Sequence, residues 1–69
     1  MEIRKYRELA GMSQRDVAKA VSVDVSTVTK WETGAADPRA RQLPVLADLF
    51  GCTIDALYGR KPHDASKAS

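Results

Sequence analysis

The segment SQRDVAKAVSVDVSTVTKWETG (residues 13–34) decides the fold of this chain. It holds two short runs in which apolar residues recur three and four positions apart, which is the period of an amphipathic helix. Ser13 is a favourable N-cap for the first run, and Asp16 completes a variant of the capping box with it. The first run therefore predicts a helix over Gln14–Val21. Its buried stripe comprises Val17, Ala18 and Val21.

A second helix is predicted only three residues later. Asp24 caps this helix, which covers Val25–Thr33, and Gly34 ends it. Two short helices joined by so few residues cannot lie antiparallel, so they cross at a large angle with Val23 in the corner. Ser22 occupies a turn position at which a left-handed backbone is needed, at a cost of about 1 kcal/mol for a residue other than glycine. This joint is that of a helix-turn-helix.

Three further helices are predicted outside this segment, and no strand. They cover residues 2–10, a stretch that begins at Arg41 or Gln42 and ends at Phe50, and a short stretch between Thr53 and Gly59. Pro44 argues against an earlier start for the fourth helix, because an interior proline costs about 3 kcal/mol. We therefore predict an all-α domain of five helices over residues 1–59. Its other inward residues are Ile3, Tyr6, Ala10, Val28, Trp31, Leu43, Leu46, Ala47 and Phe50.

The last ten residues, RKPHDASKAS (60–69), differ in character from the rest. They are polar and have no apolar period, so we interpret them as a flexible, disordered tail or the stub of a linker. They also supply the whole formal net charge of +2. Residues 1–59 sum to zero, so bulk charge is weak evidence for a nucleic-acid partner. Only the positions of the charged residues can indicate such a partner.

The composition limits the classes of function. A chain of 69 residues with 43% hydrophobic and 29% charged residues is one small soluble domain without room for a deep pocket. It contains no arrangement typical of a catalytic site, a metal site or a phosphate loop, so we expect no enzyme, no cofactor, no metal and no small-molecule substrate. No apolar run is long enough to span a membrane. The lone Cys52 fits a reduced cytoplasmic setting, as a small buried hydrophobe rather than a redox sensor.

Five stretches carry a resemblance to a known family over Ile3–Leu57. They are IRKYRELAGMSQ, DVAKAV, STVTKWETG, DP and LADLFGCTIDALYG. In this order they resemble the lambda-repressor-like, Cro/cI-type (XRE) helix-turn-helix family of DNA-binding proteins. The resemblance implies a five-helix fold whose third helix enters the major groove of DNA. Ser22 departs from the glycine that this family usually places in the turn.

The outer face of the third helix is the candidate for reading bases. Among its side chains only Lys30 can supply the donors that guanine readout uses. Serine and threonine hydroxyls can contact phosphates or bases, and a valine can pack on a thymine methyl group. The alternative is the solvated surface of a small helical domain. The candidate base-reading residues are Val25, Ser26, Thr27, Thr29 and Lys30.

Two places are candidates for phosphate contacts. The first is the start of the second helix, where free backbone N–H groups and the helix dipole favour an anion. Arg15 at this place has the alternative of a simple surface charge. The second place lies just before the fourth helix. The candidate phosphate-contacting residues are Ser13, Gln14, Arg15, Arg39 and Arg41.

The resemblance also implies contacts that serve the structure. It pairs Arg7 with Glu32 as a salt bridge that joins the first helix to the end of the third. Trp31 is expected in the core rather than against a base. The family often dimerises through its last helices, so the candidate interface residues are Ile54, Leu57 and Tyr58.

The function expected from these observations is regulation of transcription. The chain would be a sequence-specific regulator of double-stranded DNA, a bacterial or phage repressor, that acts as a homodimer on an inverted-repeat operator. A domain of this size touches about one half-site, which is too little for specificity in a genome. The alternative is a protein-interaction module of the antitoxin or adaptor type on the same fold. Three features favour that alternative: the neutral domain, Val25, and Asp24, which would lie near phosphates.

Overall fold

The computed structural model describes residues 1–59, and these residues form five helices and no strand. The helices are α1 (Ile3–Leu9), α2 (Gln14–Val21), α3 (Val25–Thr33), α4 (Gln42–Phe50) and α5 (Ile54–Leu57). The all-α prediction is confirmed, and the predicted bounds of the second and third helices are those observed. The predicted tail, residues 60–69, lies outside the described part of the chain.

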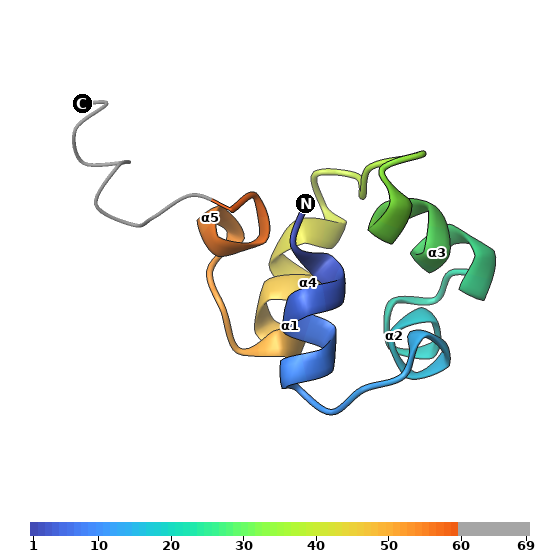
Figure 1. Cartoon of the computed structure of the whole chain (residues 1–69), viewed down its shortest axis with the longest axis horizontal. Coiled ribbons are helices and arrows are strands. Elements are labelled where there is room, and N and C mark those ends of the chain that lie inside the picture. The colour runs from blue at the N-terminus through green and yellow to red at the C-terminus, as the bar shows by residue number, and fades with distance from the viewer. Residues whose placement is uncertain (60–69) are drawn as a thin grey trace.

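The helices are arranged around a single core. Figure 1 shows α1 and α4 in the middle, α2 and α3 together at one end, and α5 at the other. Contacts between helices agree with this view, since α2 packs on α3, α4 packs on α5, and both α3 and α4 contact α1. Every helix contributes to the core. The fully or nearly fully buried side chains are Ile3, Val17, Ala18, Val28, Trp31, Leu43, Leu46, Ala47, Phe50 and Leu57.

Side-chain caps define the starts of α2 and of α3, on either side of the turn between them. The Ser13 hydroxyl accepts a hydrogen bond from the Asp16 backbone N–H, and the Asp16 carboxylate accepts one from the Ser13 N–H, which completes the predicted capping box. Asp24 caps α3 through the N–H of Ser26. Between them Ser22 has a φ of 59° and a ψ of 45°, the predicted left-handed conformation. The turn therefore exists despite the absence of glycine.

The start of α4 differs from the starts of α2, α3 and α5, each of which has a side-chain cap. The residue before it, Arg41, has a helical backbone and makes no capping hydrogen bond with its side chain. Instead the Gln42 carboxamide oxygen accepts a hydrogen bond from the Arg39 N–H at 2.7 Å. Pro44 is the third residue of the helix, where no intrahelical donor is required of it. The helix thus begins at Gln42, one of the two predicted positions.

Candidate nucleic-acid interface

The outer face of α3 is polar and accessible. Ser26, Thr29 and Lys30 are exposed, whereas Val28 and Trp31 on the opposite face are buried, as predicted. Val25 and Thr27 are only half-exposed, and Val25 packs against the core. Of the five side chains expected to read bases, three therefore lie fully on the surface, and Val25 offers only part of its side chain.

An ion pair fixes α3 to α1. The Nε atom of Arg7 lies 2.6 Å from Oε2 of Glu32, and their side chains are 12% and 6% exposed. The Arg7 guanidinium also donates to Oε1 of Glu32 and to the carbonyl of Met12. Burial raises the pKa of the Glu32 carboxyl, but hydrogen bonds from Arg7 and Gln14 together with the Arg7 charge outweigh burial and leave that pKa below its usual value. The hydrogen bond to Glu32 raises the pKa of Arg7.

Gln14 connects this ion pair to the outer face of α3. Its side-chain Nε2 donates to Oε1 of Glu32 at 3.0 Å, and its Oε1 accepts from the Thr29 hydroxyl at 3.3 Å. Sequence reasoning placed Gln14 near a phosphate but gave no indication of these two bonds. The sequence does contain a pattern that is compatible with these bonds. Gln14 is the first residue of a helix that packs on α3, and residues 29 and 32 are three apart and so lie on one face of α3.

Asp24 and Ser26 form a second hydrogen-bonded group at the start of α3. The Ser26 hydroxyl donates to Oδ2 of Asp24 at 2.5 Å, in addition to the N–H bond that caps the helix. These bonds, first that of the side chain and then that of the backbone, hold the pKa of Asp24 below its usual range. The carboxylate is therefore ionised at neutral pH and bonded to the helix.

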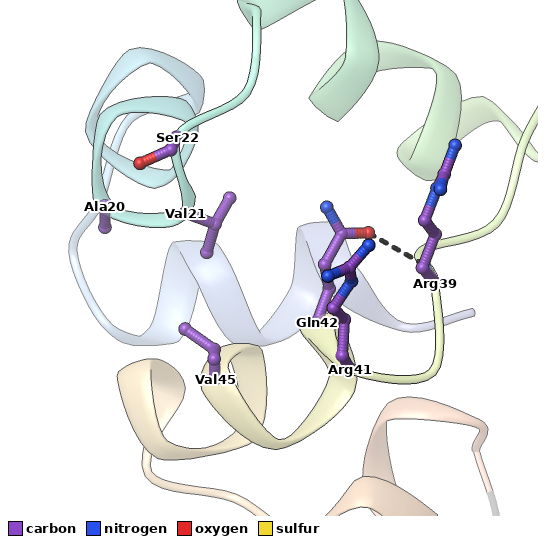
Figure 2. A pocket seen from close by; sticks show the side chains of 7 residues that line it. All are labelled: Ala20, Val21, Ser22, Arg39, Arg41, Gln42 and Val45. Atoms are coloured by element: carbon purple, nitrogen blue, oxygen red, sulfur yellow. Dashed lines mark hydrogen bonds between the residues drawn. The ribbon is translucent and has the colours of Figure 1, made fainter.

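The cations expected to contact phosphates are exposed. Arg15 lies at the start of α2, and Arg39 and Arg41 lie before α4. None of the three takes part in an ion pair within residues 1–59. Arg39 and Arg41 border an open groove of about 430 Å³ between the end of α2 and the start of α4 (Figure 2). Its other lining residues are Ala20, Val21, Ser22, Gln42 and Val45.

The candidate dimer residues on α5 divide into two kinds. Ile54 and Tyr58 are 37% and 47% exposed, so both have surface to offer a partner. Leu57 is fully buried in the core, and its assignment to the interface is wrong. The reason is that α5 is a single turn whose apolar residues cannot all face outward, and the core takes Leu57. Cys52, before this turn, is half-buried against the core, and burial raises the pKa of its thiol.

Neither a metal site nor a membrane span is found in the described region. No three His, Cys, Asp or Glu side chains gather there as metal ligands. None of its helices is long and apolar enough to cross a bilayer.

Comparisons with known proteins identify the family. The family model described as helix-turn-helix matches residues 3–57. An uncharacterized HTH-type transcriptional regulator of Methanocaldococcus jannaschii is 30% identical over 57 residues, which are 83% of this chain and 86% of the relative. No solved structure matches the chain at comparable significance. The family model covers nearly all of the five-helix domain, and α2 and α3 supply its two-helix motif. The chain therefore belongs to the Cro/cI-type helix-turn-helix family of DNA-binding transcriptional regulators.

Proposed function

We propose that this protein is a repressor that binds an inverted-repeat operator in double-stranded DNA as a homodimer. The observation that carries the proposal is the exposed polar face of α3, which the largely buried side chains of Arg7 and Glu32 join to α1. A helix presented in this way fits the major groove with its outer side chains against base edges. Repression follows from occlusion, since a dimer on the operator covers DNA that polymerase needs.

The distribution of charge supports DNA binding despite the neutrality of residues 1–59. Asp16 and Asp24 cap helices, and Glu32 is paired with Arg7, so several acidic groups are already bonded within the protein. The basic side chains of the proposed interface are exposed and form no ion pair within residues 1–59. Neutralising phosphates with such groups releases counterions from DNA. These basic residues are Arg15, Lys30, Arg39 and Arg41.

The dimer supplies the second half-site. We place the contact at the exposed part of α5, around Ile54 and Tyr58, because these are large apolar side chains at the end of the molecule away from α3. An association there leaves both copies of α3 on the outside. Two recognition helices then fit successive turns of one groove if they lie about 34 Å apart.

Titration of a labelled operator with three variants tests this assignment. Lys30→Ala is expected to weaken binding and relax base preference at one position, since Lys30 projects from the outer face of α3. Arg41→Ala is expected to weaken binding to all sequences and to lower the slope of log K against log salt by about 1, the effect of one phosphate contact. Lys5→Ala, on α1, removes the same charge and serves as the control that changes neither.

The assignment is contradicted if the three variants show equal losses of operator affinity. If Lys5→Ala weakens binding as much as Lys30→Ala does, only net charge matters and α3 does not read bases. If wild-type protein binds no duplex even at low salt, the alternative of a protein-interaction module on this fold is supported.

A further inference from the structure

The hydroxyl proton of Ser26 is already used inside the protein. Its oxygen lies 2.5 Å from Oδ2 of Asp24. An ionised carboxylate can only accept, so the serine must donate. A hydroxyl has one proton and two lone pairs. Ser26, which is exposed, therefore offers its surroundings only an acceptor.

The hydroxyl proton of Thr29 is also used inside the protein, but by different acceptors. Its hydroxyl oxygen lies 3.2 Å from the carbonyl oxygen of Val25 and 3.3 Å from the carboxamide oxygen of Gln14. Both neighbours are acceptors, so the single proton of Thr29 is directed at them. Its lone pairs stay available on the exposed side of α3.

The orientation of the Gln14 carboxamide follows from the part-buried ion pair of Arg7 and Glu32. Glu32 is bonded to Arg7 and can only accept, so the nitrogen of the Gln14 amide must face Glu32. The oxygen of that amide is then the atom that faces Thr29. A reversed amide would direct an N–H at Thr29 and occupy one of its lone pairs. Arg7 and Glu32 thus act as positioning residues for the recognition face.

Base edges in the major groove differ in what they offer to such a face. Adenine and cytosine present an exocyclic amino group, N6 or N4, whereas guanine presents two acceptors and thymine an acceptor and a methyl group. We propose that Ser26 and Thr29 act as acceptor-only readers, so that the base facing each hydroxyl is one with an exocyclic amino group. The proposal rests on the proposed DNA binding and adds the chemistry of the preferred bases. Lys30 on the same face can only donate hydrogen bonds, so it would contact the acceptors of other bases.

Base analogues in a selected operator test this directly. Adenine is replaced at each half-site position by 2-aminopurine, and cytosine by 2-pyrimidinone, which removes the major-groove amino group. Guanine is replaced by 7-deazaguanine, which removes an acceptor. Affinity is measured for the full wild-type chain and for Ser26→Ala and Thr29→Val, which lack one hydroxyl each. Circular dichroism establishes that both variants are folded under the assay conditions.

The expected result is specific coupling between one hydroxyl and one amino group. Loss of the amino group weakens wild-type binding about fivefold, the worth of one hydrogen bond, and has no further effect in the variant that lacks the facing hydroxyl. The arms with adenine and cytosine analogues identify which base supplies the amino group. A role of Ser26 or Thr29 in stability alone gives no coupling to a particular base.

Two results overturn the proposal while leaving DNA binding intact. One is coupling of either hydroxyl to 7-deazaguanine, which means that the hydroxyl donates to guanine. The other is the absence of coupling to any base for both hydroxyls. Failure to select any operator is a different result, because it contradicts the proposed function itself.

Discussion

Glu32 bonds to side chains of two other helices, and both of its carboxylate oxygens are used. Arg7 of α1 contacts both oxygens, and Gln14 of α2 contacts Oε1. Because the three residues come from three helices, this one carboxylate links α3 to both α1 and α2. Its charge is stabilised by the partners, so the stability of the domain is coupled to its ionisation.

The free energy of unfolding is expected to fall in acid through Glu32. Its folded pKa is lowered from the ordinary value of 4.5, so its contribution is present above that value and is lost as the pH falls through the folded pKa. Urea unfolding measured from neutral pH downward is the test. Glu32→Gln is expected to cost about 3 kcal/mol near neutral pH, because Arg7 is left without its counter-charge. The variant should also show a shallower loss below pH 4.5. An unchanged acid profile in Glu32→Gln contradicts the assignment.

Ser22 is expected to be replaceable by glycine with a gain in stability. Its φ of 59° is unfavourable for a side chain with a Cβ atom, and its side chain is exposed. Ser22→Gly is expected to raise the free energy of unfolding by about 0.5–1 kcal/mol. Ala20→Gly, two residues earlier in α2, is the matched control and is expected to lower it by about 1 kcal/mol. A fall in stability in both variants contradicts the account of the turn.

Features of single residues could be predicted from the sequence where a local rule or the family pattern applies. The left-handed Ser22 follows from the three-residue joint, and the partnership of Arg7 and Glu32 was expected from the family resemblance. The bonds of Gln14 were not expected, because they depend on how α2 packs on α3. Packing between helices is not encoded in any single local pattern.

At the scale of the element, each helix is too short to be stable alone. The described helices have four to nine residues, fewer than the roughly 12–15 at which an isolated helix becomes marginal in water. Capping residues and tertiary packing must therefore define their ends. The capped helices α2 and α3 were predicted at their observed bounds, whereas α1, without a side-chain cap, is shorter than predicted.

Loss of the cap on α2 is expected to destabilise the whole domain. Ser13→Ala removes the acceptor for the Asp16 N–H and should lower the free energy of unfolding by about 1 kcal/mol. Lys19→Ala, an exposed position in the same helix, is the control and should stay within about 0.5 kcal/mol of wild type. Chemical denaturation monitored by circular dichroism measures both. Equal stability of Ser13→Ala and wild type contradicts the role of the capping box.

The single turn α5 shows why Leu57 was wrongly predicted to lie on the surface. Periodicity indicates that a residue is apolar and on a face, but a four-residue helix has too little pattern to tell the inner face from the outer one. Leu57 fills the core next to α4, and its neighbours Ile54 and Tyr58 face outward. Only the packed structure distinguishes these positions.

At the scale of the whole molecule, an acidic substitution on the exposed part of α5 is expected to prevent the proposed dimerisation. Ile54→Asp introduces a charge on a half-exposed apolar surface, so we expect a monomer that retains its helical content. Leu9→Asp, at an exposed leucine on α1, is the matched control and should associate as wild type does. Sedimentation equilibrium measures the difference. Identical association of Ile54→Asp and wild type places the interface elsewhere.

The positions of α3 and α5 at opposite ends of the molecule bear on the symmetry of the operator. With α3 at one end and α5 at the other, two copies joined through α5 carry their recognition faces outward. If the proposed dimer forms, its half-sites are related by a two-fold axis, and the two copies of α3 have to lie about 34 Å apart to reach successive turns of the major groove. A monomeric reader, by contrast, requires no symmetry in its site.

Selection of random duplexes by the purified protein, at low and at moderate salt, is the most direct test of sequence-specific DNA binding by a dimer. We predict enrichment of an inverted repeat whose half-site centres lie about 10 base pairs apart, with affinity that falls steeply as salt increases. DNA binding is contradicted if no sequence is enriched at either salt concentration, and the proposed dimer is contradicted if the enriched site has no two-fold symmetry.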